Sequence, residues 1–197
     1  MPMPPIYILR HGETEWNRER RVQGTLDSAL TAKGRRQAAM QGTLLGPILA
    51  NSPAATIYCS PQGRAQTTAN IALAEYAVQP LTEPRLREVN MGDWQGQTHP
   101  EIAAHSPDRY FAHDTVFDLS LNTPGGERYS DLAARSLSFL DDLTGPSVVV
   151  THGITSIALR GLLLGLQYSE MAALDHEQGC IYVIEQGTET VLRLPTD

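Results

Sequence analysis

The sequence predicts an α/β fold: a three-layer α/β/α sandwich on a mostly parallel sheet that ends in an antiparallel edge strand. Two observations support this prediction. Short β-branched or aromatic runs, bounded by Pro, Ser or Gly, alternate with helical stretches along most of the 197 residues. Two further strand-like runs near the C-terminus are separated only by Gln-Gly-Thr-Glu, which favours a hairpin.

Each expected element follows from its local pattern. Strands are expected at 5–10, 55–60, 147–152, 180–185 and 190–194, and helices at 31–50, 64–77, 127–143 and 154–166. The first of these helices begins at a threonine cap and contains Gly42, Gly46 and Pro47. Because glycine and proline destabilise a helix interior, we expect its C-terminal half to be broken.

Residues 97–126 follow no clean period and are rich in His, Pro, Asp and Asn. We interpret them as a cap-like insertion over one end of the sheet. Residues 1–197 are then one domain, which a chain of this length can fill with a single core.

Composition and charge exclude several classes of function. The net charge of −7 argues against nucleic acid as the main partner, although residues 1–40 hold seven basic and only four acidic side chains. The N-terminus does not read as a signal peptide, and no apolar run reaches the roughly 18 residues of a membrane helix. Two cysteines make no disulfide framework. We expect a cytoplasmic protein with no membrane partner; a homodimer is compatible with the sequence.

Polar side chains follow three of the expected strands. The first strand ends in Arg10-His11-Gly12, the second leads to Arg64 at a helix start, and the third ends in Thr151-His152-Gly153. Because parallel strands end at one edge of a sheet, these groups should converge in a crevice there. Arginines and helix N-termini are suited to binding a phosphate dianion.

Several segments, in this order, carry a resemblance to a known family. They are LRHGETEWN (9–17), RVQGTLDSALTAKGRRQA (21–38), SPQGRAQTTA (60–69), LREVNMGDWQGQT (86–98), TPGGERYSDLAAR (123–135) and VVVTHG (148–153). With them the chain resembles the histidine phosphatase superfamily, in its phosphoglycerate-mutase-like family and compact bacterial phosphatase branch. It departs from the family pattern at Ala29, where Pro is usual, and at Gln95, where a Glu near the general acid is usual.

The resemblance implies a role for each polar group. His11 is the expected nucleophile, which takes the phosphoryl group onto a ring nitrogen. Arg10 and Arg64 would clamp the phosphate oxygens, and His152 would be a further phosphate contact. Glu88 is the expected general acid, with Glu13 as the competing carboxylate.

The remaining expected pocket contacts are Asn17, Gln23, Gly24 and Gly153. We expect Gly12 to keep bulk away from the incoming phosphate. Residues 97–128 should set the substrate, with Arg109, Tyr110, Phe111, Phe117 and Arg128 as candidate contacts. No zinc-binding pattern occurs, and this chemistry needs neither a metal nor another cofactor, so we expect none.

Three functions remain open at this level. Mutases of the family carry a lysine and an arginine pair after the general-acid motif, whereas the insertion here has Arg109 alone. Hydrolysis of a phosphomonoester of a small metabolite, through a phosphohistidine intermediate, is therefore favoured. A phosphoglycerate-mutase-type transfer is the alternative, and a catalytically silent phospho-ligand binder is third.

Overall fold

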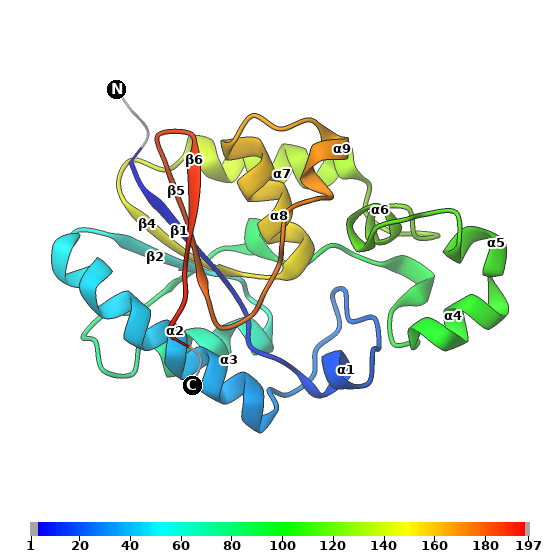
Figure 1. Ribbon diagram of the computed structural model, residues 1–197, viewed down its shortest axis with the longest axis horizontal. Coiled ribbons are helices and arrows are strands. Elements are labelled where there is room, and N and C mark those ends of the chain that lie inside the picture. The colour runs from blue at the N-terminus through cyan, green and yellow to red at the C-terminus, as the bar shows by residue number, and fades with distance from the viewer. Residues whose placement is uncertain (1–3, 196–197) are drawn as a thin grey trace.

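A computed structural model describes residues 4–195 and contains one six-stranded sheet (Figure 1). Its strands are β1 (Ile6–Arg10), β2 (Thr56–Cys59), β3 (Leu81–Thr82), β4 (Ser147–Thr151), β5 (Ile181–Glu185) and β6 (Thr188–Leu192). The spatial order is β3-β2-β4-β1-β5-β6. The β3, β2, β4 and β1 strands run parallel, and β5 and β6 are antiparallel. The predicted mostly parallel sheet with an antiparallel edge is confirmed, and β3 is an exposed two-residue strand that the sequence pattern missed.

Helices cover both faces of the sheet. The α2 (Ala32–Asn51) and α3 (Gly63–Ala72) helices pack together on one face, while α7 (Tyr129–Asp141) and α8 (Gly153–Leu163) lie on the other (Figure 1). Alternate residues of β1, β2, β4 and β5 enter different cores, as the period of two requires. Leu9 and Val148 face the α2–α3 side, whereas Ile8 and Val149 face the α7–α8 side.

The expected break in the first long helix does not occur. The α2 helix runs through Pro47, and its buried Leu45 and Ile48 join the core on that face. Its glycines serve packing instead. A Cβ on Gly42 would lie 2.7 Å from the carbonyl oxygen of Ala72, so glycine lets α2 and α3 approach closely.

The C-terminal hairpin turns earlier than the sequence suggests. Gln186 and Gly187 form a two-residue turn, both with positive φ (50° and 73°), so β6 begins at Thr188 rather than at 190. A turn with two left-handed residues matches the twist of an antiparallel pair.

Residues 97–126 contain three short helices, beyond the carboxyl ends of the parallel strands. They are α4 (His99–His105), α5 (Pro107–Tyr110) and α6 (Val116–Leu121). Trp94, Ile102 and Leu119 form a small apolar cluster with Val22, which attaches this segment to the loop after α1 (Glu15–Arg18). Other short elements are η1 (Pro84–Leu86), η2 (Gly92–Trp94) and α9 (Tyr168–Met171). Within residues 4–195 no helix has the length and apolarity to cross a membrane.

Candidate active site

A cavity of about 490 Å³ opens beyond the carboxyl ends of β1, β2 and β4. Eight of the nine site residues predicted from the sequence line it: Arg10, His11, Asn17, Gln23, Gly24, Arg64, Glu88 and Gly153. The ninth, His152, does not line the cavity. Its ring is fully buried, with its centre 5.2 Å from the centre of the His11 ring.

His11 follows β1 directly, and its backbone N–H extends the ladder to the carbonyl of Thr151. Its Nδ1 lies 2.8 Å from the carbonyl oxygen of Gly12, an acceptor, so Nδ1 carries the proton and Nε2 the lone pair. Burial, then the charges of Arg64 and Arg10, hold the pKa of His11 well below its usual value of 6.5. The imidazole is therefore neutral at physiological pH.

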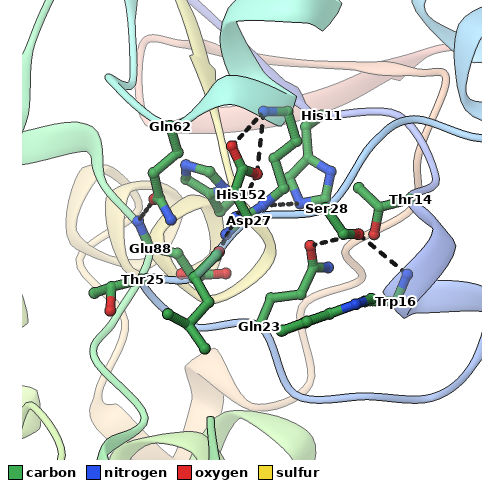
Figure 2. A network of polar contacts seen from close by, with 12 residues as sticks. His11, Thr14, Trp16, Gln23, Thr25, Asp27, Ser28, Gln62, Glu88 and His152 are labelled. Carbon is green, nitrogen blue, oxygen red and sulfur yellow. Dashed lines mark hydrogen bonds and ion pairs between the residues drawn. The ribbon is translucent and has the colours of Figure 1, made fainter. Parts of the chain in front are cut away.

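Arg64 enters from the first turn of α3 and is almost fully buried. Its Nε donates to Nε2 of His11 at 3.2 Å, and its Nη atoms donate to the carbonyls of Gly24 and Leu26. A cation is unfavourable at a helix N-terminus, and a nearby anion offsets that cost. The anion here is Asp27, whose carboxylate pairs with the guanidinium and also accepts from the backbone N–H of Arg64 (Figure 2).

Arg10 is the last residue of β1, and its Nη1 donates to the carbonyl of His176. Its Nε is buried and has no partner among the described residues. A Cβ on Gly153 would lie 3.4 Å from Cζ of Arg10, so glycine there leaves room for the guanidinium.

His152 caps the N-terminus of α8, and its Nε2 lies 2.7 Å from Oγ of Ser60. Its Nδ1 is also buried without a partner in residues 4–195. Burial, followed by the charges of Arg64, His11 and Arg10, holds the pKa of His152 well below 6.5. Buried unpaired polar groups are costly in folded proteins, so Nε of Arg10, a residue that lines the cavity, indicates a polar ligand there.

Glu88 reaches the site from the carboxyl end of β3 and lies at the N-terminus of α8. Its Oε1 accepts from the N–H groups of Val89 and Thr155, and its Oε2 accepts from that of Ile154. The competing carboxylate does not line the cavity. Glu13 is bound by Thr31 and Lys33, and the hydrogen bond from Lys33, more than any other contact, lowers its pKa.

One wall of the cavity is formed by Asn17 in α1 and by Gln23 and Gly24 in the loop after it. The side chain of Asn17 closes a capping box with Thr14, and its Oδ1 also accepts from Gln178. Gln23 accepts from Oγ of Ser28 at 3.4 Å (Figure 2). Gly24 has φ +54°, a left-handed conformation that favours glycine.

Two glutamines hold this wall in place. Gln62 donates to the carbonyl of Gly24, and its own carbonyl accepts from the N–H of Glu88 at 2.6 Å (Figure 2). Gln95 accepts from the N–H groups of Thr25 and Met91. The residue that departs from the family pattern therefore binds the loop over the wall and makes no hydrogen bond with Glu88.

Gly12 has a different role from the one expected. A Cβ there would lie 2.2 Å from the carbonyl oxygen of Gly34, and a Cβ on Gly34 would lie 2.0 Å from the carbonyl of Glu13. The two glycines let the loop after β1 lie directly against the first turn of α2. The requirement for glycine thus comes from backbone packing, and Gly12 does not line the cavity.

The sequence missed Asp27, Ser60 and Gln62, which contact site residues. Each lies inside a segment that carries the family resemblance, and that was the only available signal. Of the five residues expected to contact the substrate from residues 97–128, Tyr110 and Phe111 line the cavity. The other three, Arg109, Phe117 and Arg128, do not, and Phe117 is instead a core residue.

Most of the chain is similar in sequence to known proteins. Glucosyl-3-phosphoglycerate phosphatase of Mycolicibacterium vanbaalenii is 37% identical over 82% of this chain and 74% of its own length. "Probable phosphoglycerate mutase GpmB" of Serratia proteamaculans is 31% identical over 89% and 86%.

Two solved structures have the same fold. Bacillus stearothermophilus YhfR superposes with a TM-score of 0.81 at 33% identity, covering 95% of each chain. The mycobacterial glucosyl-3-phosphoglycerate phosphatase Rv2419c, in complex with VO3, gives 0.79 at 32% identity over 91% of this chain and 92% of its own. Residues 6–194 match the family model, and the chain belongs to the histidine phosphatase superfamily (branch 1).

Proposed function

We propose that this protein is a phosphatase that hydrolyses phosphomonoesters of small metabolites through a phosphohistidine on His11. The observation that carries the proposal is the tautomer of the His11 ring and the position of its lone pair. Nδ1 is held by the Gly12 carbonyl, and the Nε2 lone pair lies in the cavity beside Arg64. The similarity to phosphatases over most of the chain supports the same reaction.

The first half-reaction forms the phosphoenzyme. Arg10 and Arg64 bind the phosphate oxygens. The Nε–H of Arg64 then donates its hydrogen bond to a phosphate oxygen instead of to His11, which frees the lone pair on Nε2 of His11. Nε2 then attacks phosphorus as the bond to the leaving oxygen breaks. Glu88 supplies the proton that the leaving alkoxide takes up, so the products are an alcohol and phosphohistidine.

The second half-reaction regenerates the enzyme. Glu88, now a carboxylate, takes a proton from water as the water oxygen attacks phosphorus and the P–Nε2 bond breaks. Its Oε2 accepts one N–H, whereas Oε1 accepts two, so Oε2 keeps a lone pair for the transferred proton. Inorganic phosphate leaves, and His11 is neutral again.

The proposal also covers the role of residues 97–126, the location of the enzyme in the cell and its oligomeric state. Residues 97–126 act as a cap that selects the substrate, and the enzyme acts in the cytoplasm, with a homodimer as the oligomer to be tested. Cell fractionation tests the location, and size-exclusion chromatography with light scattering tests the oligomer.

Labelling tests the proposal directly. Enzyme mixed with radiolabelled phosphoester and quenched in alkaline detergent, which preserves the acid-labile P–N bond, should carry label on the chain. His11→Ala should carry none. His105→Ala is the matched control, because His105 is exposed and does not line the cavity. Equal labelling of wild type and His11→Ala would overturn the assignment.

Mutase activity is the second candidate, supported by the similarity to proteins named probable phosphoglycerate mutase. Incubation with 3-phosphoglycerate and a bisphosphate primer distinguishes the two. Release of inorganic phosphate supports hydrolysis, whereas conversion to the 2-phosphate isomer supports the mutase. A protein that binds phosphoesters but does neither would be the silent binder.

A further inference from the structure

Arg20 holds an unusual backbone conformation at the edge of the cavity. Its N–H donates to the carbonyl of Asn17, and the N–H of Arg21 donates to that of Trp16. This pair of bonds ends α1 in the motif that places one left-handed residue after a helix. That residue is usually glycine, yet here it is arginine, with φ +56°.

The side chain of Arg20 is exposed and lines the cavity. Among residues 4–195 its guanidinium has neither a hydrogen-bond partner nor an ion-pair partner, whereas the neighbouring Arg18 pairs with Glu15 and Arg21 with Glu19. The next wall of the cavity is close to it. The carbonyl of Arg20 accepts a hydrogen bond from the backbone N–H of His99. The pKa of His99 is lowered mainly by burial of the ring and, second, by the positive charge of Arg20.

The cavity therefore has two positively charged regions. Arg10 and Arg64 lie at its buried end beside His11, and Arg20 lies at its exposed rim, near the first turn of α4. The cavity wall also includes the aromatic rings of Trp94 and Tyr110, whose centres lie 6.3 Å apart. Asp114 also lines the cavity and adds negative charge on the side of the insertion.

A strained residue that persists without a structural reason points to function. Glycine would satisfy the helix end better, and arginine gains no partner in the protein. We propose that Arg20 binds a second anionic group of the substrate, a carboxylate or another phosphate, at a distance from the phosphate that is hydrolysed. This inference rests on the proposed phosphatase function and narrows its substrates to phosphomonoesters that carry such a group.

Two pairs of substrates test the inference. 3-Phosphoglycerate and glycerol 3-phosphate differ by one carboxylate on a three-carbon chain, and 6-phosphogluconate and sorbitol 6-phosphate differ in the same way on six carbons. Wild type should prefer the carboxylate in at least one pair by about tenfold in kcat/KM, the size of one charge-assisted hydrogen bond. Arg20→Gly should remove most of that preference, and Arg20→Lys should keep part of it.

Stability separates binding from folding. Because glycine fits the left-handed position, Arg20→Gly should unfold at an equal or higher temperature than wild type. Gln186→Gly is the matched control, since Gln186 has φ +50° in the β5–β6 turn and does not line the cavity. It should gain the same relief of strain and keep the wild-type preference.

The outcomes are distinct. If wild type hydrolyses p-nitrophenyl phosphate but shows no preference in either pair, or if Arg20→Gly keeps the preference, the inference on Arg20 is wrong. If wild type hydrolyses neither these substrates nor p-nitrophenyl phosphate, the proposed function fails as well.

Discussion

The Nε–H of Arg64 donates to the Nε2 lone pair of His11 over 3.2 Å, so the clamp and the nucleophile are hydrogen-bonded to each other. Only a neutral imidazole with its proton on Nδ1 can accept that bond. The contact therefore fixes both the protonation and the orientation of His11. A phosphate that draws the guanidinium toward its own oxygens frees the nucleophile as it binds.

Asp27 should act on catalysis through Arg64, because it pairs with the guanidinium but does not line the cavity. We expect Asp27→Asn to lower kcat/KM about tenfold or more, the effect of weakening one charged contact in a mostly buried site. Asp142→Asn, which removes an exposed partner of Arg85, is the control.

A double-mutant cycle shows whether the effect runs through Arg64. The double variant Asp27→Asn/Arg64→Lys should lower kcat/KM, relative to wild type, by clearly less than the product of the two single effects. Full additivity would show that Asp27 does not position Arg64.

Glu88→Gln should slow turnover in a way that depends on the leaving group. Loss of a general acid costs about 10²–10⁴-fold for an alkyl phosphate, whose alkoxide needs the proton. The phenolate of p-nitrophenyl phosphate needs little protonation, so its hydrolysis should slow far less. Glu13→Gln should leave both rates unchanged because Glu13 is bound by Lys33 and Thr31 outside the cavity. Equal slowing of both substrates by Glu88→Gln would argue against this role.

The protein should lose stability as the pH falls from 6.5 to about 5. The buried rings of His11 and His152 have pKa values well below 6.5, so in this window the unfolded chain binds protons that the folded protein does not. Carboxyls of the unfolded chain stay mostly ionised there. Each histidine should contribute at most about 1.5 kcal/mol to the loss.

Denaturant titrations at the two pH values measure this loss. Between the two pH values, the free energy of unfolding should decrease less in His152→Asn than in wild type. His105→Asn, which changes an exposed histidine, is the control and should show the same decrease as wild type. A wild-type stability that is flat between pH 6.5 and 5 would contradict the neutral assignment.

Inorganic phosphate should stabilise the fold, because Nε of Arg10, which lines the cavity, is buried without a partner in the described chain. At a phosphate concentration of 100 times Kd the gain is about 2.7 kcal/mol, visible as a higher Tm. Sodium chloride at equal ionic strength is the control. Arg10→Lys should show a smaller phosphate-induced shift, and an equal shift from chloride would mean that no specific anion site exists.

The strand ends explain why much of the site could be predicted. In a parallel sheet, residues that follow β1, β2 and β4 meet at one edge whatever lies between them, so Arg10, Arg64 and His152 follow from the strand pattern alone. Glu88 came from the family resemblance. The structure shows why Glu88 reaches the site: β3 pairs parallel with β2, so the chain that follows β3 starts at the same edge of the sheet.

What the sequence could not predict depends on contacts between distant segments. The helix through Pro47 is stabilised by its core side chains and its close approach to α3, and local propensity carries no information about either. Likewise Asp27 becomes the partner of Arg64 only when the loop after α1 folds over the start of α3.

The back-to-back glycines at 12 and 34 affect how variants of this protein should be interpreted. Gly34 lies in α2 and does not line the cavity, yet any side chain there must displace the loop that carries His11. A survey that scored turnover alone would therefore rank Gly34→Ala with His11→Ala. The affinity for phosphate and the yield of folded protein would tell a displaced backbone from a lost nucleophile.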